Sequence, residues 1–387
     1  MKILWAKTDF LHPTNRGGQI RTLEMLKRLS CRNEVHYVAY DDPATPEGRE
    51  RASEYSAKSF PVNRPIAPRG SPRFFGQLAA NLVSPLPLAI ARYRSDIMRD
   101  QIARLIEAEN YDAVVADFLS ITPNFENLSR CVLFQHNVES MIWKRHAEHA
   151  ASPQRRIYFR SQARRMEKYE GAVCRAVSWV ISVSPADSQM MRETYGVERI
   201  DDVPTGVDLD YFRRPADAPA TSDVVFVGAM DWLPNIDGAL WFMREVFPLI
   251  RSARPETSVT FAGRNPPPEI RALAGVQVTG TVPDVRPYLW GASVSIVPLR
   301  IGGGTRLKIY ESMAAGVPVV STSVGAEGLA VMDGRDIRLA DDAAGFARRV
   351  LELLANPAER RAPAADRFSW ESVTERFEQI LQAARAT

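Results

Sequence analysis

The sequence predicts an α/β protein built from two Rossmann-like, doubly wound domains. Short apolar runs alternate with segments of helical spacing along most of the chain, which is typical of parallel sheets covered by helices. A length of 387 residues suits two domains. Residues 204–219 are rich in turn formers and lack periodicity, so we place the boundary between residues 1–204 and residues 205–368 there.

Composition narrows the class of protein. An apolar content of 45% and a charged content of 25% are ordinary for a globular protein, and a net charge of +3 is too small to indicate nucleic acid as a partner. The three cysteines are far apart and lack metal-ligand spacing. We interpret them as structural thiols in a reducing cytosol. The N-terminus has no signal-peptide pattern, and the best apolar run, residues 78–91, is too short to span a bilayer. We therefore expect a cytoplasmic protein, with association at the cytoplasmic membrane face left open.

The first domain opens with a strand, a glycine loop and a helix. Residues 2–6 form the expected strand, Gly17 and Gly18 lie in the loop, and apolar residues at helical spacing follow over 20–29. Dinucleotide binding through G-x-G-x-x-G needs its glycines directly after the strand. This loop is longer and holds only the glycine pair, so a dinucleotide cofactor is disfavoured.

Polar residues follow two later strands of the first domain. The strand expected at 113–116 ends at Asp117, and the strand at 131–134 is followed by His136 and Glu139. Ligands of open α/β sheets bind beyond the carboxyl ends of the strands, so this position favours a functional histidine. A structural role for His136, as a helix cap or a buried core histidine, stays open.

Residues 64–95 differ from their surroundings. They contain five arginines and no acidic residue, interleaved with phenylalanine, leucine and tyrosine. One interpretation is a flap that meets anionic lipid headgroups or a lipid-linked acceptor. The other, which the prolines favour, is a helical insertion whose apolar face covers the sheet.

Two charged segments invite functional interpretations that we set aside. Residues 153–174 form an expected long helix, whose basic face we interpret as solvated. Asp208 and Asp210 form a D-x-D pattern, but the domain linker gives no rigid cage for a hard cation and no third ligand is in view. We therefore predict no metal site and assign Asp208 to fixing the chain at the linker.

Strands expected in the second domain at 224–227, 259–262 and 276–279 each lead into a glycine loop. The residues that follow these strands are Gly228, then Gly263 with Arg264, then Gly280 with Thr281. A fourth strand, at 294–297, feeds a more elaborate segment. The alternation of strands and helices again implies a parallel sheet.

Residues 298–324 run from a strand end through a glycine loop into a helix that Gly316 ends. The loop consists of Gly302, Gly303, Gly304 and Thr305. Arg306 and Lys308 follow at the helix N-terminus, where the dipole disfavours cations unless an anion is bound. Glu311 comes about one and a half turns into the helix, near the face of Lys308. A nucleoside diphosphate suits this set, with its phosphates at the cations and a ribose hydroxyl at the carboxylate.

The chain resembles the retaining glycosyltransferases of family 4. The resemblance covers nearly the whole chain, and its most specific motif is GGGTRLKIYESMAAGVPVVST around Glu311. Supporting features are the Gly17-Gly18 loop, the strand-end His136, the loop after VFVG, the linker VPTGVDLDYF and the ending FSWESVTERFEQIL.

The resemblance implies the GT-B fold, in which two Rossmann-like domains face a central cleft. The C-terminal helix, here residues 369–387, would cross back to the first domain. It implies a hexosyltransferase of polysaccharide or glycolipid synthesis that needs no cofactor or metal. Its donor would be a UDP- or GDP-sugar in the second domain, and its partner a glycan or lipid-linked acceptor in the first.

Residue roles follow by the same analogy. Arg306 and Lys308 would bind the diphosphate, Glu311 the ribose, and His136 would contact the transferring sugar. The pair Gly17 and Gly18 would approach donor phosphate or acceptor. The base pocket would be lined by Gly263, Arg264 and Thr281. The remaining donor-binding positions are Gly228, Gly302, Gly303, Gly304 and Thr305.

Two departures from the family pattern matter. Gly303 stands where the family often has a second glutamate, eight residues before Glu311. Residues 229–235 lack the Arg and Lys that the family often has there. A branch linked to polysaccharide and lipid-linked glycan synthesis looks similar in both respects.

The resemblance implies transfer with retention along a front-face path, with the departing diphosphate stabilised by fixed cations. Two alternatives stay open. One is a sugar-nucleotide 2-epimerase of the same fold, which needs acid/base residues on the first domain. The other is a nucleotide-sugar-binding protein without turnover, which the glycine at position 303 motivates. No motif names the base, the sugar, the acceptor or the linkage.

Overall fold

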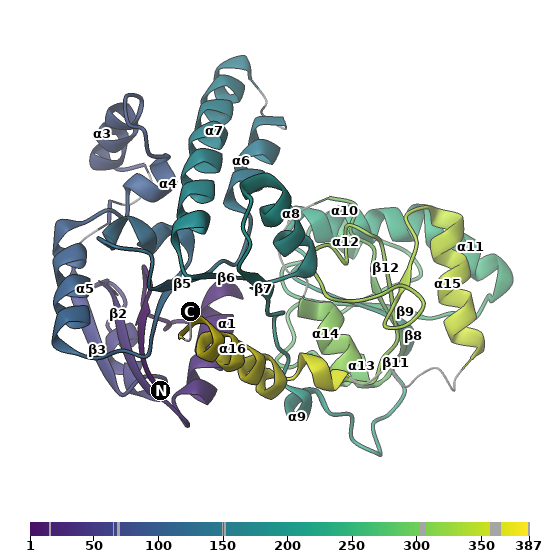
Figure 1. Cartoon of the computed structure of the whole chain (residues 1–387). Coiled ribbons are helices and arrows are strands. Elements are labelled where there is room, and N and C mark those ends of the chain that lie inside the picture. Colours follow the sequence, from purple (N-terminus) through teal and green to yellow (C-terminus); the bar gives the residue numbers. More distant parts are fainter. Residues whose placement is uncertain are drawn as a thin grey trace. The chain divides into compact units, whose positions relative to one another are not determined.

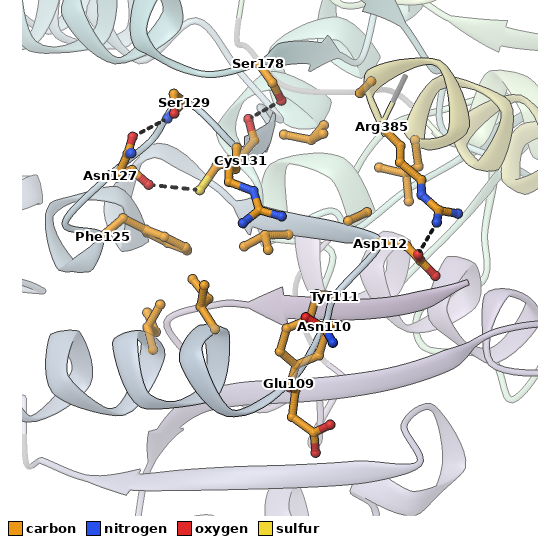
Figure 2. Close-up of a pocket in the computed structure, with 18 of the residues that line it drawn as sticks. Glu109, Asn110, Tyr111, Asp112, Phe125, Asn127, Ser129, Cys131, Ser178 and Arg385 are labelled. Carbon is orange, nitrogen blue, oxygen red and sulfur yellow. Dashed lines mark hydrogen bonds and ion pairs between the residues drawn. The ribbon is translucent and has the colours of Figure 1, made fainter. Parts of the chain in front are cut away.

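The computed structural model describes residues 1–14, 17–64, 66–67, 70–148, 150, 152–301, 307–356 and 365–385. The chain divides into two compact units. Unit 1 comprises Met1–Pro204 and the chain from Val373 onward, and unit 2 comprises Thr205–Ser372. Each unit is built on one parallel sheet with helices around it, so the expected α/β class with two Rossmann-like units is confirmed (Figure 1).

Unit 1 alternates strands and helices. The strands are β1 (Lys2–Ala6), β2 (Glu34–Asp41), β3 (Lys58–Asn63), β4 (Ala113–Asp117), β5 (Cys131–Phe134), β6 (Trp179–Ser182) and β7 (Ile200–Asp202). The helices are α1 (Gly17–Leu29), α2 (Glu47–Glu50), α3 (Pro72–Asn81), α4 (Leu88–Ala91), α5 (Asp96–Ala108), α6 (Glu139–Glu148), α7 (Pro153–Ala176), α8 (Pro185–Tyr195) and α16 (Trp370–Arg385), with 3-10 turns at Ala52–Glu54 and Leu119–Asn124. As predicted, Ser184 caps α8, because its hydroxyl accepts the amide of Asp187.

Among the described residues, the unit 1 sheet has the order β3-β2-β1-β4-β5-β6-β7. The chain starts at β1 in the middle, builds to one side and then returns to the other, so the order reverses between β1 and β4. Leu4, Val114 and Leu133 belong to the core that one sheet face forms with α5, α7 and α8. Strands covered on both faces are buried along their whole length, which explains the continuous apolar runs of the sequence.

The last helix, α16, belongs to unit 1 from Val373 onward. Its Phe377 ring packs against Trp5 and Phe134, with centroids 5.5 and 5.0 Å apart. Hydrogen bonds from Arg376 to the carbonyl of Asp202 and from Arg32 to Glu378 fix the helix further. The sequence placed this return to the first domain at residue 369, shortly before the division at Val373.

Unit 2 repeats the plan. Its strands are β8 (Ser222–Val227), β9 (Val259–Ala262), β10 (Gln277–Val278), β11 (Ala292–Val297), β12 (Val319–Ser321) and β13 (Arg338–Leu339). Its helices are α9 (Leu209–Phe212), α10 (Leu233–Trp241), α11 (Phe247–Ala253), α12 (Pro268–Arg271), α13 (Arg286–Trp290), α14 (Leu307–Ala314) and α15 (Ala343–Ala355), with a π turn at Phe242–Val246 and a 3-10 turn at Ala365–Phe368. The described strands follow the order β10-β9-β8-β11-β12-β13, which reverses between β8 and β11.

Three local findings bear on the expectations from sequence. Asp208 lies at the start of α9 and accepts the amide of Tyr211, so it is a helix cap in the linker. Gly316 has φ of +73° and ends α14 as predicted. In residues 64–95, Ile90 of α4 joins the core, whereas α3 leaves Phe75 more than half exposed. The insertion that we expected to cover the sheet therefore does so only in part.

Candidate active site

Three polar side chains of unit 1 come from the strand ends at the point where the strand order reverses. Lys7 directly follows β1, Asp117 ends β4, and His136 lies two residues beyond β5. In open α/β sheets this switch point is where ligands bind. The sheet topology therefore places His136 at a ligand-binding edge of unit 1, together with two residues that the sequence had not assigned to the site.

The buried Asp117 carboxylate accepts hydrogen bonds from four side chains of the described chain. One oxygen accepts from Trp5 Nε1 at 3.0 Å, Lys7 Nζ at 2.8 Å and Thr22 Oγ1 at 2.7 Å, and the other accepts from His136 Nε2 at 2.8 Å. Burial by itself raises the pKa of this carboxyl, but the charge of Lys7 and the bond to His136 outweigh it and hold the pKa below its usual range. Asp117 is therefore an ionised, rigidly held acceptor.

This acceptor sets the state of the His136 ring. Burial lowers the pKa of His136 to about 3 despite the opposing carboxylate, so the ring is neutral at physiological pH. Because Nε2–H is donated to Asp117, the lone pair is on Nδ1. A Cβ on Gly18 would lie 3.8 Å from that Nδ1, so this nitrogen faces the N-terminal turn of α1. The ring is clamped by Phe118, stacked at 3.9 Å, and by Phe134 at 4.3 Å.

Gly18 and Phe118 depend on each other. A Cβ on Gly18 would lie 2.8 Å from the Phe118 ring, closer than side-chain contacts allow, whereas one on Gly17 would meet no atom within 4 Å. Phe118 has φ of 74° and ψ of 151°, a backbone conformation essentially restricted to glycine that costs about 1–3 kcal/mol. The ammonium of Lys7 lies 4.2 Å from the centre of the same ring. Strain of this kind is typical of a functional site.

A second acidic residue lies close by in the chain. Glu139 begins α6, and the fully buried Glu170 carboxylate accepts the amides of Glu139 and Ser140, at 2.8 and 3.0 Å, together with bonds from Gln135 and Tyr195. Burial and the charge of Glu170 raise the pKa of Glu139 to about 7. Unit 1 thus carries a carboxyl poised to exchange a proton near neutral pH.

In unit 2, two predicted glycines permit the close approach of strand ends. A Cβ on Gly263 would lie 1.7 Å from the carbonyl oxygen of Gly228. A Cβ on Gly228 would lie 2.7 Å from Asn235 Nδ2 and 2.8 Å from Lys308 Nζ. Backbone packing therefore requires glycine at position 263, whereas a side chain at position 228 would displace Asn235 and Lys308. The same packing brings Lys308 to the carboxyl end of β8.

Two groups of the described chain hold Lys308 in place. Its Nζ donates to Asn235 Oδ1 at 2.9 Å and lies 4.7 Å from the centre of the Phe226 ring. Asn235 is itself fixed, since its amide donates to the carbonyl of Ala229 at 2.8 Å. The ammonium is therefore positioned at the point where the strand order of unit 2 reverses, between β8 and β11.

Glu311 lies on the same helix, α14, one turn after Lys308. It is half-buried, and its carboxylate makes no side-chain hydrogen bond to any residue that the structure describes. Burial raises the pKa of Glu311, and the nearby Lys308 opposes that effect. A half-buried carboxylate with no donor among the described residues is able to accept hydrogen bonds from hydroxyl groups.

The other predicted positions are more exposed or lie outside the described residues. Arg264 is exposed and forms a 3.7 Å ion pair with Asp231, and Thr281 is exposed after β10. The loop of Gly302, Gly303, Gly304 and Thr305, with Arg306, lies outside the described residues.

Sequence reasoning missed Lys7, Asp117, Phe118 and Asn235 as members of these clusters. Asp117 carried a usable signal, since it ends a buried strand as His136 follows one. Lys7 stands directly after β1 in the same way. The position of Asn235, seven residues after Gly228, gave no such signal.

The described residues contain neither a membrane-spanning helix nor a cluster of metal ligands. No helix there combines the length and apolar character needed to cross a membrane. No group of three or more His, Cys, Asp or Glu side chains there is arranged to hold a metal ion.

Two Rossmann-like units, each with polar side chains gathered where the strand order reverses, define the class of two-domain α/β proteins that bind ligands at strand ends. Two family models match this chain, one in each half of the sequence. Residues 15–211 match the model described as "Glycosyltransferase Family 4", and residues 221–356 match "Glycosyl transferases group 1". The chain belongs to glycosyltransferase family 4.

Similar proteins match this chain along most of its length. A Klebsiella pneumoniae protein described as "Uncharacterized 44.6 kDa protein in cps region" is 21% identical over 95% of both chains. Sucrose-phosphate synthase from Thermosynechococcus elongatus shares the fold, with a TM-score of 0.68, 17% identity and coverage of 100% of this chain and 99% of that one. Anabaena Alr3699/HepE in complex with UDP has a TM-score of 0.64 and 12% identity, and the match covers 99% of this chain and 100% of that one. The same protein is also solved with UDP-glucose. Likeness to these structures supports the GT-B fold.

Proposed function

We propose that this glycosyltransferase moves a hexose from a UDP- or GDP-sugar to a hydroxyl of a glycan or lipid-linked acceptor, with retention of anomeric configuration. The observation that carries the donor assignment is the pair formed by Lys308 and Glu311. A fixed ammonium and a half-buried carboxylate without a described protein donor lie one helical turn apart. These groups complement a diphosphate and a ribose, respectively.

The names of similar proteins support the donor class. Alr3699/HepE is solved with UDP and with UDP-glucose. In the proposed complex, Lys308 contacts the diphosphate, with Arg306 as a second cation, and Glu311 accepts from ribose hydroxyls. Gly228 and Gly263 keep the strand ends close enough for the backbone to approach the nucleotide. No metal or other cofactor is invoked.

We propose that His136 contacts the sugar that is transferred. With Nε2–H committed to Asp117, Nδ1 is an acceptor for a sugar hydroxyl, and the neutral ring adds no positive charge beside an oxocarbenium-like centre. In the proposed step the bond from C1 to the diphosphate oxygen breaks and the acceptor oxygen bonds to C1 on the same face. The acceptor proton passes to the departing phosphate, whose charge the cations stabilise.

The test is a transfer assay with sugar nucleotides and an acceptor extract, following release of the nucleoside diphosphate and formation of the glycosylated product. We expect loss of turnover in Lys308→Met and His136→Ala and unchanged turnover in Arg348→Met, which alters an exposed cation of α15. Unchanged product formation in Lys308→Met and His136→Ala would contradict the site.

Incubation of the sugar nucleotide without acceptor distinguishes the alternatives. If an epimer of the sugar nucleotide formed, the proposed function would have to change from glycosyl transfer to 2-epimerisation. Binding of the sugar nucleotide without turnover on any acceptor extract would favour a binding protein.

A further inference from the structure

Unit 1 exposes large apolar side chains on α3, on the turn after it and on α7. Phe75 is 57% exposed, Leu82 62%, Val83 90% and Ile157 69%. Single exposed apolar residues are ordinary, but a group of this size on neighbouring elements indicates a surface that contacts something apolar.

Hydrogen bonds fix the two elements to each other. The Arg165 guanidinium of α7 donates to the carbonyls of Asn81 and Leu82, at 2.6 and 2.9 Å. Gln162 of α7 donates to the Asn81 side chain at 3.0 Å and accepts the amide of Leu88 at 2.8 Å. Figure 1 shows α3 level with the N-terminal half of α7. The turn that carries Leu82 and Val83 is therefore rigidly attached to α7.

The charges on α3 and on the first part of α7, up to residue 166, have one sign. Residues 55–95 and residues 149–166 contain no aspartate and no glutamate. The exposed arginines of α3 and of α7 up to residue 166 are Arg73, Arg155, Arg156, Arg160 and Arg164. With a net charge of only +3 for the whole chain, this concentration of cations is local. Cations beside exposed apolar side chains complement an anionic surface over an apolar layer.

We propose that these residues of α3 and α7, which we call the α3–α7 surface, dock unit 1 on a bilayer that contains anionic phospholipid. The apolar tips of Leu82, Val83 and Ile157 enter the headgroup region, and the arginines meet lipid phosphates while their aliphatic stems lie along the apolar layer. The basic face of α7, which we interpreted from sequence as solvated, becomes part of this surface. A lipid-linked acceptor would then be presented at the same membrane.

The test is sedimentation of the full chain with vesicles of phosphatidylcholine, with and without phosphatidylglycerol, at low and high salt. We expect binding only to the anionic vesicles and weakening by salt. Arg155→Glu/Arg156→Glu should lower the partition coefficient roughly 30-fold or more, since each cation near such a surface contributes about fivefold. Val83→Asp should lower it about tenfold.

Matched controls lie in unit 2. Leu249→Asp and Arg348→Glu make the same changes at exposed positions of α11 and α15 and should leave binding unchanged. Thermal unfolding verifies that each variant is folded. Equal partition onto both kinds of vesicle, no binding to either, or equal loss in the control variants would overturn the proposal. Vesicle binding needs no sugar nucleotide, so this result is independent of the transfer assay.

Discussion

The substitution Glu139→Gln tests whether burial and the neighbouring Glu170 oppose ionisation of the Glu139 carboxyl. Burial and Glu170 raise the pKa of Glu139 from 4.5 to about 7. As pH rises from about 4.5, the unfolded chain loses this proton while the folded protein keeps it, so stability falls until the folded form ionises near pH 7. The difference of about 2.5 pKa units, at about 1.4 kcal/mol for each unit, gives about 3.5 kcal/mol. Because Glu139 is partly exposed, we expect about 2–3 kcal/mol.

Urea unfolding near pH 5 and near pH 8.5 measures this effect, with tryptophan fluorescence as the probe. Glutamine is neutral throughout, so Glu139→Gln should be about 2–3 kcal/mol more stable than wild type at the higher pH and much closer to it at the lower. Glu148→Gln, an exposed glutamate at the other end of α6, is the matched control and should not show this pH dependence. If Glu139→Gln differs from wild type by the same amount at both pH values, Glu139 ionises freely and the burial argument is wrong.

Three further substitutions probe the geometry. Asp117→Asn removes the charge that balances buried Lys7 and should cost about 3–5 kcal/mol in urea unfolding, so a loss below about 1 kcal/mol would contradict the network. Gly18→Ala forces a Cβ against the Phe118 ring and should cost about 1–3 kcal/mol and lower transfer turnover, whereas equal stability of Gly18→Ala and Gly17→Ala would argue against that contact. Gly263→Ala places a Cβ on the Gly228 carbonyl and should cost about 3 kcal/mol or more in thermal unfolding, which a wild-type midpoint would refute.

Much of the fold follows from local pattern. Buried parallel strands such as β1 and β4 are continuous apolar runs, and Ser184 with Pro185 marks a helix start by chemistry that acts within one turn. Strand β3 is mostly exposed or half-buried and contains a proline, so it lacked such a pattern and was not predicted. Helix α3 has the amphipathic pattern of a covering helix, yet it leaves Phe75 exposed, because periodicity cannot say what an apolar face meets.

Some residues of the candidate site could likewise be predicted from the sequence, and others could not. The strand-end position of His136 and the glycines Gly228 and Gly263 follow from a topology that the sequence predicts. The Asp117 network does not, because Thr22 and Trp5 reach that carboxylate from 95 and 112 residues away in the chain. Contacts of that separation depend on the strand order and leave no local signature.

The central claim is that unit 2 binds a nucleoside diphosphate sugar through Lys308 and Glu311. Titration calorimetry of the full chain with UDP- and GDP-sugars tests it most directly, using Glu311→Gln and, as a matched control, Glu256→Gln at an exposed position. We predict saturable binding of one donor class, weakened about 10- to 100-fold by Glu311→Gln and unchanged by Glu256→Gln. Wild-type affinity in Glu311→Gln, or no binding of any sugar nucleotide by wild type, would contradict the account.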